Sequence, residues 1–191
     1  GGYKVSGGLH GVGSSVVNAL SEWLELTIHR DGKIYHQVFR QGGKIIEKPK
    51  NLGDTKRTGS TIKFKPDPKI FSSTIFEYKT IASRLKESAF LIKGLRIELN
   101  DLRTGKSDVF HYENGIIEFI KTLVEGKKRL HEPVFMSGTV MGILVEIAIQ
   151  YCGEVYNENI LSFVNNIRTR DGGTHEVGFK TALTRAFNEH A

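Results

Sequence analysis

The hydrophobic and polar positions near the start of the chain predict a helix followed by a β-hairpin. Apolar residues recur every three to four positions over residues 14–24, which is the repeat of a helix that buries one face. Residues 24–29 and 33–39 alternate between apolar and polar side chains instead, as half-buried strands do. Asp31-Gly32 lies between them and is a pair that tight hairpin turns prefer. We therefore expect two antiparallel strands after the helix.

The middle of the chain continues with further strands and a helix. Glycine and proline residues divide this stretch, and the apolar spacing changes from a period of two to a helical period and back. The pattern predicts a loop or short strand pair at 41–57, a strand at 61–65, a helix at 77–91, and a hairpin of residues 95–99 and 109–112.

Glu113-Asn114-Gly115 interrupts the pattern, so we expect a domain boundary near residue 114. Beyond it the spacing predicts a helix at 116–123, long strands at 142–151 and 160–167, and a helix at 173–188. The predicted domains are therefore residues 1–114 and 115–191. Strands and helices occur in both, which places the chain in the α+β class.

The composition is typical of a soluble folded protein from a reducing compartment. Cys152 is the only cysteine, so it cannot form an internal disulfide, and no Cys/His cluster has the spacing of a zinc site. No apolar run approaches the roughly 18 residues that a membrane span requires. We expect no structural metal and a cytoplasmic location. The formal net charge of +6 is compatible with contact to a polyanion such as nucleic acid.

A glycine-rich segment, residues 7–13, precedes the first predicted helix. Its glycines permit backbone conformations that other residues avoid, and the N–H groups at a helix N-terminus suit a phosphate chain. The segment is therefore either an anion cradle or a flexible turn. No Lys-Ser or Lys-Thr pair follows the last glycine, which excludes a P-loop. No strand precedes it with an acidic residue at ribose distance, which disfavours a dinucleotide fold.

Such a motif ordinarily lies between elements, yet here it follows Gly1-Gly2 almost directly, without an initiator methionine. We therefore expect the chain to be a piece of a longer protein.

Three segments of the chain resemble the B subunits of the bacterial type IIA DNA topoisomerases, gyrase and topoisomerase IV. Residues 2–21 are similar to the ATP-lid motif of this family, residues 58–64 to a later strand of its nucleotide site, and residues 165–180 to its transducer. The resemblance thus covers the whole chain. It implies a GHKL (Bergerat-type) ATPase sandwich, truncated at its N-terminus, for residues 1–114. For residues 115–191 it implies an incomplete transducer of ribosomal S5 domain 2-like fold.

The resemblance also implies which residues bind ligands. With ATP as the nucleotide, the implied contacts are Tyr3, Gly8, Leu9, His10, Gly11, Val12, Gly13 and Ser60. Ser60 stands where the family usually has threonine and keeps its hydroxyl. Arg30 matches an arginine that contacts aminocoumarin inhibitors. The family's general base and its Mg²⁺ ligand would lie upstream of Gly1, so no catalytic residue is implied here, and we expect the 191-residue chain alone to hydrolyse no ATP.

Basic residues surround the Asp171-Gly-Gly-Thr-His segment of the second domain. Arg168, Arg170, Lys180 and Arg185 have the composition of a nonspecific contact to DNA phosphates, although a solvated helix face would have it too. We interpret His175 as structural.

The family resemblance implies a subunit that couples ATP hydrolysis to the passage of one DNA duplex through another, in decatenation and relaxation. The topoisomerase A subunit would be its partner in a heterotetramer, while we expect this chain alone to be a monomer. Residues 87–91, 110–115 and 168–173 look more like topoisomerase IV, with gyrase as the alternative. A noncatalytic nucleic-acid-binding module, or another ATPase of the same superfamily, are alternatives outside the family.

Overall fold

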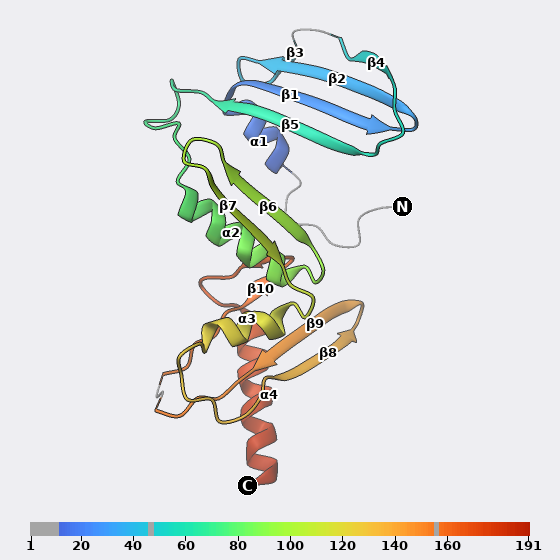
Figure 1. Ribbon diagram of the computed structural model, residues 1–191. Helices are drawn as coiled ribbons and strands as arrows, with labels where there is room; N and C mark the ends of the chain where they lie inside the picture. The colour runs from blue at the N-terminus through green and yellow to red at the C-terminus, as the bar shows by residue number, and fades with distance from the viewer. Residues whose placement is uncertain (1–11, 46–47, 155–156) are drawn as a thin grey trace. The chain divides into compact units, whose positions relative to one another are not determined.

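The computed structural model describes residues 12–45, 48–154 and 157–191, and these form two compact units that meet in sequence at Phe76 and Glu77 (Figure 1). The first unit is an antiparallel sheet with a short helix. Its elements are α1 (Gly13–Ala19), β1 (Ser21–Arg30), β2 (Lys33–Arg40), β3 (Lys44–Ile45), β4 (Lys50–Asp54) and β5 (Gly59–Pro66). The strands pair in the order β3-β2-β1-β5, and β4 also pairs with β2.

The β1–β2 hairpin confirms the predicted turn. Arg30 pairs with Lys33, so Asp31 and Gly32 alone form the connection. Their φ angles are +51° and +74°, the two left-handed conformations of a type I′ turn, whose twist matches that of the strands. The turn therefore fixes the register in which β1 meets β2.

The helix expected over residues 14–24 is shorter than predicted, because a strand takes over its second half. The Ser21 hydroxyl donates to the Val17 carbonyl at 2.6 Å and closes α1. From Trp23 onward β1 pairs with β2 on one side and β5 on the other. Hydrogen bonds on both flanks outweigh the helical spacing of the side chains.

The second unit carries the remaining elements. These are α2 (Tyr78–Leu91), β6 (Arg96–Asp101), β7 (Lys106–His111), α3 (Ile116–Leu123), β8 (Val134–Val140), β9 (Ile143–Ile149), β10 (Phe163–Val164), β11 (Ile167–Arg168) and α4 (Thr174–His190). The strands pair as three hairpins, β6-β7, β8-β9 and β10-β11. No helix within the described ranges is long and apolar enough to cross a membrane.

An aromatic stack forms the core of this second unit. Phe90 of α2 is 1% exposed, and its ring lies 3.6 Å from that of Tyr112 and 4.8 Å from that of Phe119 in α3, measured between centroids. The stack thus joins residues on both sides of position 114. The domain boundary expected there lies inside this unit and stays a prediction.

One strand prediction in the second half was wrong, and a second strand is present with shorter bounds than predicted. The long strand expected at 160–167 is instead a short hairpin, because Asn165 and Asn166 adopt positive φ angles of 48° and 64° and reverse the chain. The strand expected to begin at Gly142 begins after it, since Met141 and Gly142 form the turn between β8 and β9. β8 itself was not predicted, because Ser137-Gly138-Thr139 interrupts its apolar residues.

Candidate functional site

Most of the expected nucleotide contacts lie outside the described residues. These are Tyr3, Gly8, Leu9, His10 and Gly11. Val12 and Gly13 are described and lead into α1, where the Val12 carbonyl accepts a hydrogen bond from the Val16 amide at 2.9 Å. Val12 is 51% exposed, and a Cβ added to Gly13 would meet no atom of the described residues within 4 Å, apart from its chain neighbours and the backbone of its own helix. Among the described residues, none therefore covers Gly13 where its side chain would begin.

The structure brings Ser60 and Arg30 to one end of the sheet. Ser60 pairs with Ile28 across β5 and β1, and Arg30 follows two residues later along β1. Because alternate residues of a strand point to the same face, Ser60, Ile28 and Arg30 share a face. Ser60 is exposed, and the Arg30 side chain is 78% exposed, with its Nε 3.4 Å from the Asp31 carboxylate. Both polar groups are thus accessible from solvent.

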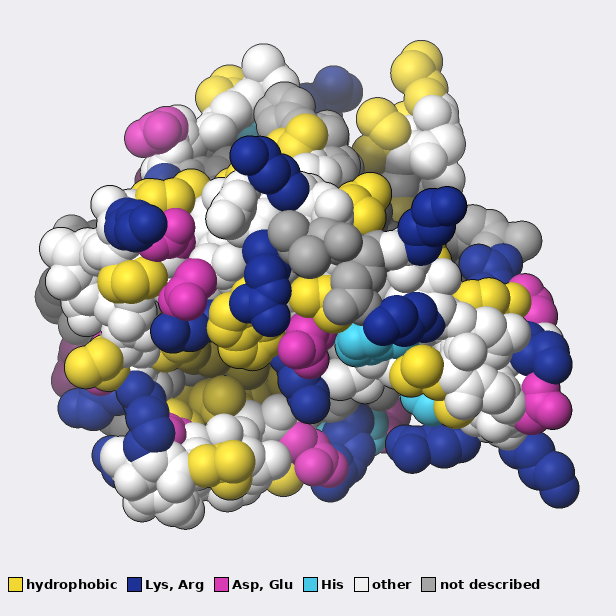
Figure 2. Space-filling model, turned by 90° about the horizontal axis from the view of Figure 1, so that it is seen from above, with side chains coloured by type: hydrophobic (Ala, Val, Ile, Leu, Met, Phe, Trp, Pro, Cys, Tyr) yellow, Lys and Arg dark blue, Asp and Glu magenta, His cyan; other side chains and the backbone are white. Residues whose placement is uncertain are grey.

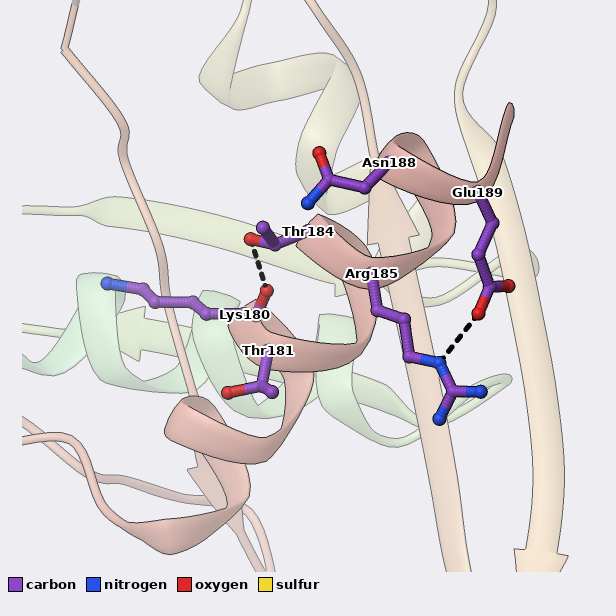
Figure 3. Close-up of a pocket in the computed structure, with 6 residues that line it drawn as sticks. All are labelled: Lys180, Thr181, Thr184, Arg185, Asn188 and Glu189. Carbon is purple, nitrogen blue, oxygen red and sulfur yellow. Dashed lines mark hydrogen bonds and ion pairs between the residues drawn. The ribbon is translucent and has the colours of Figure 1, made fainter. Parts of the chain in front are cut away.

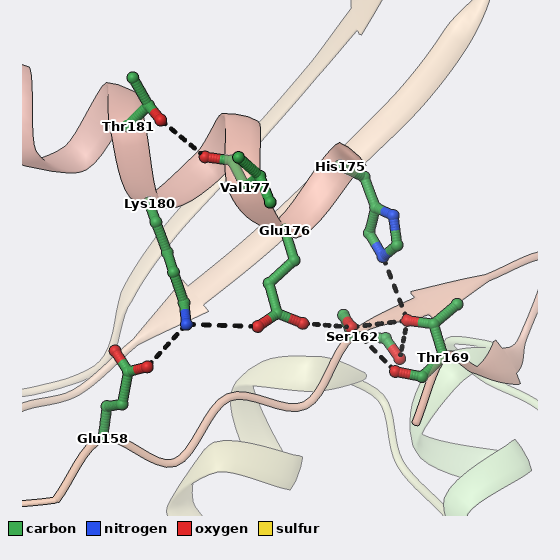
Figure 4. A network of polar contacts seen from close by, with 8 residues as sticks. All are labelled: Glu158, Ser162, Thr169, His175, Glu176, Val177, Lys180 and Thr181. Atoms are coloured by element: carbon green, nitrogen blue, oxygen red, sulfur yellow. Dashed lines mark hydrogen bonds and ion pairs between the residues drawn. The ribbon is translucent and has the colours of Figure 1, made fainter. Parts of the chain in front are cut away.

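A polar network holds the segment around His175 in the second unit (Figure 4). Thr169 lies opposite Ser162, with their hydroxyl oxygens 2.6 Å apart, and the Thr169 amide donates to the Ser162 carbonyl at 2.9 Å. The Ser162 hydroxyl donates to Glu176 at 3.0 Å, and His175 Nε2 lies 3.1 Å from the Thr169 hydroxyl. His175 is therefore one of the side chains that contact Thr169, and its structural role stays a prediction.

The two glycines before α4 make this network sterically possible. Gly172 has a φ of +70°, which residues with a side chain rarely adopt. A Cβ added to Gly173 would lie 2.8 Å from ring atoms of His175, and one added to Gly172 would lie 3.3 Å from Glu176. The Gly-Gly pair therefore lets the side chains of the first turn of α4 fold back toward Ser162 and Thr169.

Lys180 is tied to two carboxylates. Its Nζ lies 2.6 Å from Glu158 and 3.4 Å from Glu176, one turn earlier on α4. The hydrogen bond to Glu158 raises the pKa of Lys180 above its ordinary value, with a further contribution from Glu176. Lys180 therefore remains protonated, while the two carboxylates offset its charge.

The other three DNA-contact candidates have different surroundings. Arg185 Nε lies 2.7 Å from the Glu189 carboxylate on the exposed side of α4, along a shallow open groove (Figure 3). Arg168 and Arg170 are exposed, and neither has an ion pair within the part of the chain that the structure describes. Figure 2 shows Lys and Arg side chains spread over the viewed face with Asp and Glu among them. Each basic side chain therefore has its own charged surroundings.

Sequence reasoning missed Ser162, Thr169, Glu176 and Glu158 as members of this network. A signal was present in Asn165-Asn166, since this pair favours positive φ angles and therefore a tight turn. Reading that turn would have placed Ser162 opposite Thr169. Among the residues that the structure places, no group of three or more His, Cys, Asp or Glu could hold a metal ion.

The sequence is similar to known topoisomerase subunits along its whole length. The DNA topoisomerase 4 subunits B of Staphylococcus aureus strains MW2 and COL are each 59% identical to it over 194 residues. These matches cover 100% of this chain and 29% of each relative, so the chain spans less than a third of their length. A family model described as DNA gyrase B matches residues 115–191.

Solved structures agree with the sequence comparison. The 43K ATPase domain of Thermus thermophilus gyrase B, in complex with an aminocoumarin, superimposes with a TM-score of 0.85 at 40% identity. The B-subunit of the DNA gyrase from Myxococcus xanthus superimposes with a TM-score of 0.77 at 30% identity. The matches cover 95% and 89% of this chain, respectively, and 50% of each solved chain. This chain therefore belongs to the family of gyrase and topoisomerase IV B subunits, and it has the α+β GHKL fold of their ATPase region.

Proposed function

We propose that this chain is part of the ATP-binding and transducer region of a topoisomerase IV B subunit, which couples ATP hydrolysis to DNA strand passage. The observation that carries the proposal is the 59% identity to topoisomerase IV subunits B over all of the chain. Gyrase remains the alternative, because two solved structures that superimpose on the chain are gyrase B subunits, at 40% and 30% identity.

A topology assay distinguishes the two. The full-length B subunit, assembled with the A subunit from the same organism, is expected to decatenate linked DNA circles and to relax supercoils when ATP is present. Gyrase would instead introduce negative supercoils into relaxed plasmid. ATP-dependent negative supercoiling would therefore overturn the assignment to topoisomerase IV but keep the family. Binding of DNA with no response to ATP would favour a noncatalytic module.

ATP and Mg²⁺ are the proposed cofactors. Ser60 is exposed, and no described atom outside the neighbouring residues and the helix backbone would lie within 4 Å of a Cβ at Gly13, so both positions are compatible with a bound nucleotide. We assign the phosphate contacts to the main chain of residues 8–13, and the nucleoside contacts to Tyr3 and Ser60. Bound Mg²⁺ would offset phosphate charge during hydrolysis. At a hundredfold excess over its Kd, a nonhydrolysable ATP mimic is expected to add about 2.7 kcal/mol to the free energy of unfolding of the full-length subunit. A rise in its melting temperature would measure this.

DNA and the topoisomerase A subunit are the proposed partners, with two copies of each subunit in a heterotetramer. The candidates for DNA contact are Arg168, Arg170, Lys180 and Arg185. The first two are favoured, because Lys180 and Arg185 already pair with carboxylates that compete with a phosphate. We also propose that residues 1–114 and residues 115–191 belong to two separate domains.

A further inference from the structure

Thr169 stands between Arg168 and Arg170, which form no ion pair with any residue that the structure describes, and is itself held by several hydrogen bonds. Its hydroxyl oxygen lies 2.6 Å from the Ser162 hydroxyl, 3.1 Å from the Ser162 carbonyl oxygen and 3.1 Å from His175 Nε2. Its amide donates to the same carbonyl at 2.9 Å, and its own carbonyl accepts from the Gly172 amide at 3.1 Å. Thr169 is half-buried, whereas Arg168 and Arg170 are exposed. The backbone between the two arginines is thus held by hydrogen bonds on its buried side, while both arginine side chains are exposed to solvent.

Glu176 extends this attachment to α4. One carboxylate oxygen accepts from the Ser162 hydroxyl at 3.0 Å, and the other lies 3.4 Å from Lys180 Nζ (Figure 4). Ser162 therefore connects Thr169 on one side with α4 on the other. Through these contacts the β10–β11 hairpin and the first turns of α4 form one hydrogen-bonded unit that carries the segment 168–170.

We propose that Thr169, Ser162 and Glu176 are positioning residues that hold Arg168 and Arg170 ready to bind DNA phosphates. The inference rests on the proposed function, which supplies DNA as the ligand. Fixing the main chain before binding removes an entropic cost that a mobile loop would have to meet when the duplex arrives. The arginines supply the charge, and the network supplies their placement.

The test measures the binding of duplex DNA to the full-length B subunit, assembled with its A subunit, over a range of salt concentrations. Arg168→Gln and Arg170→Gln should each reduce the slope of log K against log salt by about 1, because each removes one phosphate contact. Thr169→Val keeps both arginines and nearly the same shape but loses the hydroxyl. It should weaken binding at fixed salt by about fivefold, the effect of one net hydrogen bond.

Two comparisons separate positioning from a general loss of structure. Thr169→Ser, which retains the hydroxyl, should restore wild-type affinity. Thr122→Val is the matched control, because the exposed Thr122 hydroxyl bonds only the Glu118 carbonyl of its own helix at 3.0 Å in the described structure. Ser162→Ala removes the partner hydroxyl and should repeat the loss, so it replaces Thr169→Val if that variant does not fold.

Each outcome has a distinct meaning. Wild-type affinity in both Thr169→Val and Ser162→Ala would overturn the positioning role while leaving the arginines as contacts. Unchanged salt slopes in both arginine variants would show that Arg168 and Arg170 do not contact DNA phosphates, and would leave the proposed function intact. Absence of DNA binding by the unmodified complex would instead contradict the proposed function.

Discussion

At the scale of single residues, Arg30 offers a direct test of the nucleotide-site assignment. It ends β1 with a side chain that is 78% exposed, on the face that carries Ser60. Arg30→Gln keeps a polar side chain but removes the charge. A hydrogen bond to a charged group contributes about 1.5–3 kcal/mol, so we expect aminocoumarin affinity to fall by at least about tenfold. Calorimetric titration of the full-length B subunit measures this.

Arg40→Gln is the control for this prediction, since the exposed Arg40 lies at the opposite end of the same hairpin. An equal loss of affinity in both variants would mean that net charge, and not a contact at Arg30, determines inhibitor binding.

Asp101 makes a pH-dependent contribution to stability. Its carboxylate accepts hydrogen bonds from Arg103 Nε and Nη2, each at 2.9 Å, and the residue is 9% exposed. These hydrogen bonds hold the pKa of Asp101 well below its usual value. Because the folded-state pKa is the lower one, the stabilisation is present above the unfolded-state pKa of about 3.9 and is lost as pH falls through the folded-state pKa.

We therefore expect Asp101→Asn to be less stable than the unmodified protein at pH 7, and the difference to shrink steadily below about pH 4. Urea unfolding at a series of pH values measures it. Asp54→Asn is the control, since Asp54 pairs with Lys33 at an exposed position where ion pairs contribute little. A difference that does not change with pH would show that Asp101 acts by packing instead.

At the scale of elements, the turns determine which residues of neighbouring strands pair with one another. Asp31-Gly32 forms a two-residue turn with both φ angles positive. Gly32→Ala should destabilise the protein by about 1–2 kcal/mol, because an L side chain is strained in this conformation. Asp31→Asn should be nearly neutral, since asparagine tolerates the left-handed region. Urea unfolding compares the two, and equal stability of Gly32→Ala and wild type would contradict the turn geometry.

The predictions at this scale succeeded where one period dominated a segment. The helix expected at 116–123 has those bounds, and the residues expected for the β1–β2 hairpin pair as predicted. They failed where a turn was read as strand, as at Asn165-Asn166, or where polar residues interrupted a strand, as in β8. The spacing of apolar residues indicates which face of an element is buried. It does not indicate the backbone φ angles that make a turn.

At the scale of the whole molecule, the aromatic core of the second unit spans the domain boundary that the sequence predicts at residue 114. Phe90 is stacked on Tyr112 and Phe119, which lie before and after the boundary expected at 114. Phe90→Ala should destabilise this unit by about 3–5 kcal/mol, the cost of a large cavity. We expect hydrogen exchange to accelerate in α2 and α3 together, as measured by mass spectrometry on the full-length subunit.

Phe135→Ala is the control, because Phe135 on β8 is already 40% exposed and leaves no comparable cavity. Acceleration confined to α2 in the Phe90 variant would show that α3 folds independently and would support a boundary at 114.

The sequence by itself determined the family, because residues 2–21 and two later segments carry motifs that are contiguous in the chain. It also determined the elements whose apolar period is regular, and the residue types available for phosphate contact. Only the tertiary structure decided which of those residues act together. Lys180 and Arg185 match Arg168 in charge, but carboxylates of Glu158, Glu176 and Glu189 occupy them. The pairs with Glu176 and Glu189 join residues four apart on one helix, which the sequence spacing allows, whereas the pair of Lys180 with Glu158 depends on where turns reverse the chain. Those turns are set by local backbone angles that side-chain hydrophobicity does not encode.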